Sequence, residues 1–234
     1  MSVRRIVTLT AGALLLGAGA FALYLWIRPD PEATSARLTV LSGTVRIERG
    51  NALRAPGAGT LLQPGDVVST KAAAQAAIGW PNGAVTRLDS GTRAVIEDLS
   101  YKDSAWVVTA RLLEGRTWTH TSRPGQVRVR GGSGFVAQNS GPAQFEVDFS
   151  TASPAVPVTK VIDWSGSVQF LDSPPISLTG GQWTSTASTA PANPPQPITG
   201  PQRQDPFTVF NLALDAGRQT GRLDRQQNLP RGLA

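Results

Sequence analysis

The sequence predicts an all-β domain, solenoid-like or sandwich-like and punctuated by glycine turns, behind one N-terminal transmembrane helix. Three observations support this prediction. A strand–glycine–strand pattern occurs twice along the chain. The 234 residues include 24 glycines and 18 prolines, a content that favours many turns and short strands. Residues 6–27 carry no charge and form an apolar run near the N-terminus.

The repeated pattern begins with Ser-Gly-Thr-Val at 42–45 and with Ser-Gly-Ser-Val at 165–168. A second glycine turn follows each copy, in LLQPGDVVST at 61–70 and in ISLTGGQWTST at 176–186. Internal similarity of this kind indicates that one small β unit is used more than once in a stacked or wound sheet. The copies differ in internal length, which indicates a decayed duplication.

The glycines of the pattern are the predicted structural turns. We expect Gly43, Gly65, Gly166 and Gly181 at turns or bulges, several of them with positive φ, where a side chain costs on the order of 1 kcal/mol or more. Asp66 directly follows one of these glycines. Aspartate in such a turn is expected to accept hydrogen bonds from backbone amides.

These motifs resemble the FecR domain, a family of extracytoplasmic bacterial domains. The first matching stretches are SGTVRIERG, LLQPGDVVST and AIGWPNGAVTRL; the later ones are VRVRGGSGFVAQ, KVIDWSGSVQF and SLTGGQWTST. The resemblance covers roughly residues 37–188 and contains no catalytic signature. It implies an all-β, wound domain. Members of the family relay envelope signals, with a receptor contacting the periplasmic part and a cytoplasmic part controlling a sigma factor.

The N-terminal run at 6–27 is long enough to span a bilayer as a helix. Arg4 and Arg5 precede it, so the positive-inside bias places residues 1–5 in the cytoplasm and the chain after Arg28 outside. We expect a single-pass protein of the bacterial cytoplasmic membrane. So short a cytoplasmic stub leaves no room for the sigma-binding part of the family.

A cleaved signal peptide is the alternative interpretation of this segment. Ala18-Gly19-Ala20 resembles a small-residue cleavage site, which would place the mature start near Phe21. The apolar run continues past that site, beyond the length of a typical signal sequence. We therefore favour an uncleaved anchor.

The remaining chain divides by composition. Residues 28–36 form a short juxtamembrane spacer, and residues 37–188 form the β domain. Residues 189–206 are rich in Pro, Ala, Ser and Thr, and are expected to be an extended or disordered linker. Residues 207–234 are expected to hold a short helix and a polar tail.

The predicted helix starts at Asp205-Pro206, with aspartate as the cap and proline in the first turn. Phe207, Phe210 and Leu214 share one helical face, and Gly217 is the expected stop. Ten residues do not hold a helix alone in water. We expect this face to dock on the chain's own β domain, with docking on a partner as the alternative.

The sequence offers no catalytic constellation. It contains no cysteine and a single histidine, His120, which excludes a thiolate nucleophile and a zinc cluster. Glu146 and Asp148 share a strand face and are interpreted as solvated acids. We expect no enzyme activity, no cofactor and no metal.

The net charge of +6 includes a cluster of arginines between residues 111 and 130. The candidate binding face consists of Arg111, Arg116, Trp118, Arg123, Arg128 and Arg130. Arginines beside an aromatic ring suit an acidic wall polymer or glycan. Outward arginines on amphipathic strands are the simpler interpretation. Nucleic acid is not expected as a partner, because no nucleic-acid fold signature is present.

These observations favour a non-enzymatic, membrane-anchored extracytoplasmic module that acts by contacts with an envelope protein whose identity the sequence does not give. The alternative is an envelope module that holds acidic polymer or glycan through the arginine face.

Overall fold

The computed structural model describes residues 35–102, 105–122, 126–132, 135–139, 141–151, 156–171, 174–187 and 190–227. Strands make up 60% of the structure and helices 10%, which confirms the all-β prediction. The predicted transmembrane segment at 6–27 lies outside these residues. Among the residues described, no helix combines the length and the apolar character needed to cross a membrane.

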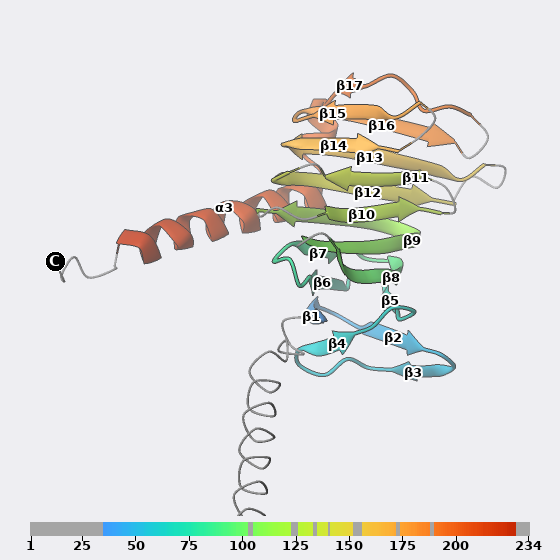
Figure 1. Cartoon of the computed structure of the whole chain (residues 1–234), viewed down its shortest axis with the longest axis vertical. Coiled ribbons are helices and arrows are strands. Elements are labelled where there is room, and N and C mark those ends of the chain that lie inside the picture. The colour runs from blue at the N-terminus through green and yellow to red at the C-terminus, as the bar shows by residue number, and fades with distance from the viewer. Residues whose placement is uncertain are drawn as a thin grey trace, which may run out of the picture. The chain divides into compact units, whose positions relative to one another are not determined.

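The strands form two sheets, and after the first few strands the order in each sheet follows the sequence (Figure 1). Sheet A runs β4 (Thr60–Leu62), β1 (Ala36–Ser42), β6 (Gln75–Gly79), β7 (Val85–Leu88), the second half of β9 (Ala105–Thr121), β12 (Ala143–Ser150), β13 (Val158–Ser165), β16 (Gln182–Ala187) and β17 (Gln196–Pro197). Sheet B runs β3 (Ala52–Arg54), β2 (Val45–Arg49), β5 (Val67–Thr70), β8 (Arg93–Lys102), the first half of β9, β10 (Gln126–Gly131), β11 (Phe135–Asn139), β14 (Ser167–Phe170) and β15 (Ile176–Thr179).

Strand β9 belongs to both sheets. Its first half pairs with β8 and β10, and its second half pairs with β7 and β12. Gly115 lies between the halves with φ +90°, and a Cβ at this position would lie 2.6 Å from the Cα of Thr92. A residue with a side chain does not fit here, so glycine permits the strand to change sheets.

The core lies between the sheets and follows the alternation of the strands. Val127 and Val129 are buried, whereas Arg128 and Arg130, which alternate with them, are only partly buried and lie on the outer face. Each fully buried aliphatic or aromatic side chain contributes roughly 1.5–3 kcal/mol. The larger core residues are Leu38, Ile47, Val68, Ile78, Leu88, Ile96, Leu112, Phe145, Val147, Val161, Phe170 and Leu178.

The first glycines of the two repeat copies occupy equivalent places. Gly43 carries the chain from β1 in sheet A to β2 in sheet B, and Gly166 carries it from β13 in sheet A to β14 in sheet B. Their φ angles are +67° and +98°, as the repeat predicts. The second glycines, Gly65 and Gly181, have φ of +93° and +92°.

The repeat does not extend through the second turns. Gly65 precedes a step from sheet A to sheet B, whereas Gly181 precedes the step from β15 in sheet B to β16 in sheet A. Asp66 accepts a hydrogen bond from the Gln63 amide at 2.8 Å, as expected of a turn aspartate, and also pairs with Arg49.

The segment at 190–206, expected to be extended or disordered, is in part held against the edge of sheet A. Strand β17 pairs with β16, and Asn193 exchanges hydrogen bonds with Ser185 and Thr184 of that strand. Ala192 packs against the core. The segment has few large apolar side chains, but a sheet edge can hold a polar segment through backbone hydrogen bonds. Helix α2 (Gly200–Arg203) follows.

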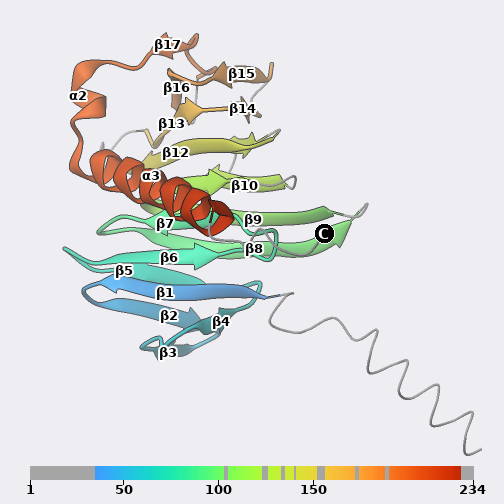
Figure 2. The same ribbon diagram turned by 90° about the vertical axis from the view of Figure 1, so that its left-hand side faces the viewer.

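Helix α3 (Pro206–Gln227) extends past the stop expected at Gly217. Glycine ends a helix when it adopts a left-handed conformation, and Gly217 does not adopt one. In a helix interior glycine costs about 1 kcal/mol relative to alanine, which weakens a helix without ending it. The helix crosses the outer face of sheet A over β7, β9 and β12 (Figure 2).

Candidate functional site: the seat of the C-terminal helix

The surface beneath α3 is built from residues that lie side by side across sheet A. Arg87 of β7 pairs in register with Trp118 of β9, which pairs with Glu146 of β12, which pairs with Ile162 of β13. All four point away from the core, yet each is at least 97% buried. Arg87, Trp118 and Glu146 contact α3 through hydrogen bonds, and we call the whole row the helix seat.

The first turn of α3 is fixed by Asp205. Its Oδ1 accepts hydrogen bonds from the backbone N–H of Phe207 at 3.0 Å and of Thr208 at 3.1 Å, as the predicted cap requires. Arg116 of β9 donates to the same oxygen at 2.9 Å. Partial burial raises the pKa of Asp205, but these hydrogen bonds outweigh it and hold the pKa below its usual range.

Asp215 is the centre of the contact further along the helix. Its carboxylate accepts hydrogen bonds from Arg87 Nη2 at 2.5 Å and Trp118 Nε1 at 3.0 Å, and from Gln144 Nε2 at 3.2 Å. His120 Nδ1 lies 3.3 Å away. Burial raises the pKa of Asp215, yet the hydrogen bonds from His120 and Arg87 dominate and lower it to about 2.

A second contact of Arg87 comes from Asn211, one helical turn before Asp215. Arg87 Nη1 donates to Asn211 Oδ1 at 2.9 Å, and Asn211 Nδ2 donates to the carbonyl oxygen of Phe207 at 2.7 Å. The fully buried guanidinium therefore has two oriented acceptors on one helix face. A buried charge is tolerated when it is paired and hydrogen-bonded in this way.

Arg116 joins the helix to the other end of the seat. It pairs with Asp89 at 2.5 Å and with Glu146 at 3.6 Å, and its guanidinium lies 4.8 Å from the centre of the Phe207 ring. Glu146 also accepts a hydrogen bond from the Thr208 hydroxyl at 3.3 Å. Burial raises the pKa of Glu146 to about 7, against the opposing charge of Arg116.

The docked face of α3 differs from the predicted apolar face. Phe207 is 2% exposed and docks, but Phe210 is only partly buried and Leu214 is 37% exposed. The face consists instead of Phe207, Thr208, Asn211 and Asp215. The polar residues of this face are spaced at i, i+3 and i+7, a helical pattern that the sequence contains but that the apolar residues alone do not reveal.

The predicted arginine face is not one surface. Because β9 changes sheets at Gly115, Arg111 lies on sheet B while Arg116 and Trp118 lie under α3 on sheet A. Arg111 and Arg130 both pair with Glu97. Trp118 is fully buried and is stacked on Trp164 with 5.7 Å between ring centres. Arg123 lies outside the described residues.

The chemistry of the seat is that of a docking contact. The Asp215 carboxylate accepts a hydrogen bond from Arg87, and the Asp205 carboxylate accepts hydrogen bonds from Arg116 and two backbone amides. His120 is partly buried beside Asp215. Among the residues that the structure describes, no group of three or more histidines and acids is placed to hold a metal ion.

No family model matches the chain, and no curated protein matches it. Two crystal structures of a candidate anti-sigma factor from Parabacteroides distasonis are similar to it, with 18% and 16% sequence identity and TM-scores of 0.46 and 0.45. Each match covers 56% of this chain and spans 59% of the length of the solved structure.

Proposed function

We propose that this chain is a non-enzymatic, membrane-anchored extracytoplasmic module that acts by protein–protein contacts in envelope signalling or assembly. The apolar run at 6–27 and the arginines before it support the anchor and its orientation. The FecR-like motifs support the class of module. The observation that carries the proposal is the docking of α3 on the β domain through buried, directional polar contacts.

Such contacts suit a segment that exchanges with a partner. A buried ion pair such as Arg87–Asp215 fixes the geometry of docking strictly, but a hydrophobic contact of the same size is often the more stable one. The seat therefore selects its helix by the positions of its charged groups. In this proposal an envelope protein binds α3, or occupies the seat in its place.

Site-specific crosslinking in cells tests this proposal. A photoreactive residue at Val209, 51% exposed on the outward face of α3, should give a discrete crosslink to an envelope protein. The same residue at Leu53 of β3, 60% exposed, is the matched control and should not give that product. Identical products at both positions, or none at Val209, would contradict a partner that contacts the helix.

Cell fractionation tests the topology separately. The protein should remain with the cytoplasmic membrane, and protease added to intact spheroplasts should digest the β domain. A mature N-terminus near Phe21 would show that the apolar segment is a cleaved signal peptide.

A further inference from the structure

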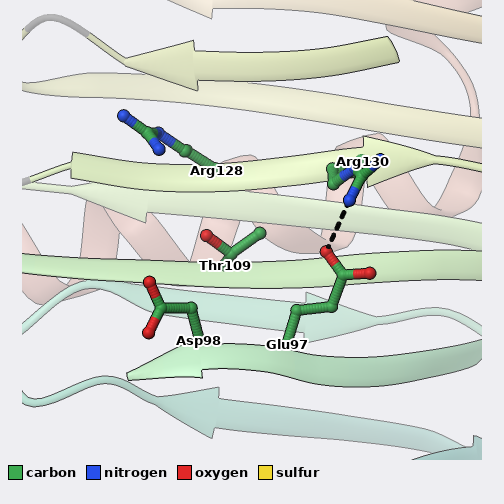
Figure 3. A pocket seen from close by; sticks show the side chains of 5 residues that line it. All are labelled: Glu97, Asp98, Thr109, Arg128 and Arg130. Atoms are coloured by element: carbon green, nitrogen blue, oxygen red, sulfur yellow. Dashed lines mark hydrogen bonds and ion pairs between the residues drawn. The ribbon is translucent and has the colours of Figure 1, made fainter. Parts of the chain in front are cut away.

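A second polar surface lies on the outer face of sheet B, on the opposite side of the sandwich from α3. Asp98 of β8 pairs in register with Thr109 of β9, which pairs with Arg128 of β10. Two strand spacings, about 10 Å, therefore separate the backbones of the acid and the arginine. Figure 3 shows Thr109 between them, over a cleft of about 290 Å³ that Glu97 and Arg130 complete.

A bulge in β8 builds this cleft. The pairing with β9 shifts between Ile96 and Asp98, so that Ile96 faces the core while Glu97 and Asp98 line the outer cleft. Bulges commonly redirect side chains in this way. Glu97 accepts a hydrogen bond from Arg130 Nη1 at 3.2 Å and lies 2.6 Å from Arg111 Nε. The charge of Glu97 is thus compensated, and Glu97 and Arg130 form one wall of the cleft.

The other two charges of the cleft are engaged only by neutral groups among the described residues. Arg128 donates to Gln138 Oε1 at 2.7 Å and to Gln126 Oε1 at 2.9 Å. Asp98 accepts a hydrogen bond from the Ser100 hydroxyl at 3.0 Å. These amides and this hydroxyl orient the charged groups without neutralising them.

We propose that this cleft binds a small zwitterion, an amino acid or dipeptide, with its carboxylate on Arg128 and its ammonium group on Asp98. Arginine binds carboxylates through paired hydrogen bonds, and charge-assisted hydrogen bonds are the stronger kind. The Thr109 hydroxyl lies between the two charges and both donates and accepts.

The alternation of charge across the cleft selects this class of ligand. A simple anion attracted by Arg128 meets Asp98 across the cleft, and a simple cation attracted by Asp98 meets Arg128. A neutral sugar leaves both charges without a counter-charge. A zwitterion satisfies both at once. The proposal does not depend on the function proposed for α3, because the two surfaces share no residues.

Ligand-observed NMR with the full-length protein tests this site. The probe is the dipeptide Ala-Ala, compared with N-acetyl-Ala-Ala, which lacks the ammonium group, and with Ala-Ala-amide, which lacks the carboxylate. Ala-Ala should bind saturably, and each capped form should bind about tenfold more weakly or worse, since each loses one charge-assisted contact. Absence of saturable Ala-Ala binding at millimolar concentration, or equal binding of the capped forms, would overturn the proposal.

Two substitutions of similar shape and one control locate the contact. Asp98→Asn and Arg128→Gln should each weaken Ala-Ala binding by about tenfold or more. Arg93→Gln, also on β8 but paired with Glu48 away from the cleft, should leave it unchanged. Equal loss in all three variants, or tighter binding of glucuronate than of Ala-Ala by the native protein, would also refute the assignment.

Discussion

Arg87 of β7 and Asp215 of α3 form an ion pair with 2.5 Å between Nη2 and Oδ1, and each side chain is 1% exposed. The two residues are 128 positions apart in the sequence. Removing one member leaves the other buried and uncompensated, which costs roughly 3–5 kcal/mol in measured cases. The pair therefore couples the last element of the chain to the middle of sheet A.

Asp215→Asn should release α3 from the seat, because Arg87 then loses its counter-charge. Undocking limits the cost, so protease sensitivity within 206–217 should rise sharply while the β domain keeps its strand signal in circular dichroism. The double variant Arg87→Met with Asp215→Leu should recover part of the protection, since apolar pairs of similar volume often replace buried ion pairs without loss. A double variant less protected than Asp215→Asn would contradict this view of the seat.

Phe207→Ala and Leu214→Ala form a matched pair on the same helix. Phe207 is 2% exposed and lies against Arg116, whereas Leu214 is 37% exposed. Truncating a buried Phe typically costs about 3–5 kcal/mol, so Phe207→Ala should undock the helix, which is measured as increased amide hydrogen exchange in α3. Leu214→Ala should cost well under ~1 kcal/mol. Equal destabilisation by the two substitutions would instead support the apolar docking face that the sequence suggested.

The contrast between these residues shows where sequence reasoning ends. Alternation and glycine turns specify the strands because both are local, so Gly43 and Gly166 were predicted correctly at turns. The seat depends on partners 62 to 128 positions apart, and in the sequence Arg87 resembles any outward arginine on a strand. The prediction of one arginine face was wrong for a related reason. Because β9 changes sheets at a glycine, the arginines lie on different sheets.

Glu146 should make stability depend on pH. Its pKa in the folded protein is about 7, above the usual value of 4.5, because burial disfavours the charged form. The folded state retains this proton to a higher pH than the unfolded chain does. The resulting stabilisation is complete below pH 4.5 and declines as pH rises to 7, by up to about 3 kcal/mol. Glu146→Gln should flatten this part of the curve in urea unfolding at several pH values. An unchanged slope would show that Arg116 keeps the carboxylate charged throughout.

Asp163 of β13, inside the sandwich, should also lower the folding stability as pH rises. It is fully buried, and burial raises its pKa to about 7, although a hydrogen bond from the Ser165 backbone opposes the shift. Neither carboxylate oxygen has a hydrogen-bonding side-chain partner in the described structure. Asp163→Asn should therefore raise the unfolding midpoint at pH 8 and change it little at pH 4. A larger gain at pH 4 than at pH 8 would reverse the sign and exclude this origin.

The destabilisation caused by replacing a repeat glycine with alanine should depend on the space around that glycine. Its position within the repeat should not decide it. A Cβ at Gly43 would lie 2.7 Å from the Cα of Ala74, and one at Gly166 would lie 2.2 Å from the carbonyl oxygen of Pro142. A Cβ at Gly65 or Gly181 would meet nothing within 4 Å.

All four glycines have positive φ, so each substitution by alanine carries the conformational cost of about 1–2 kcal/mol. Gly43→Ala and Gly166→Ala must in addition displace backbone at a crossing between the sheets, and should be clearly more destabilising in chemical unfolding than Gly65→Ala and Gly181→Ala. Equal losses at all four would mean that the crossings relax freely and that backbone conformation alone selects glycine there.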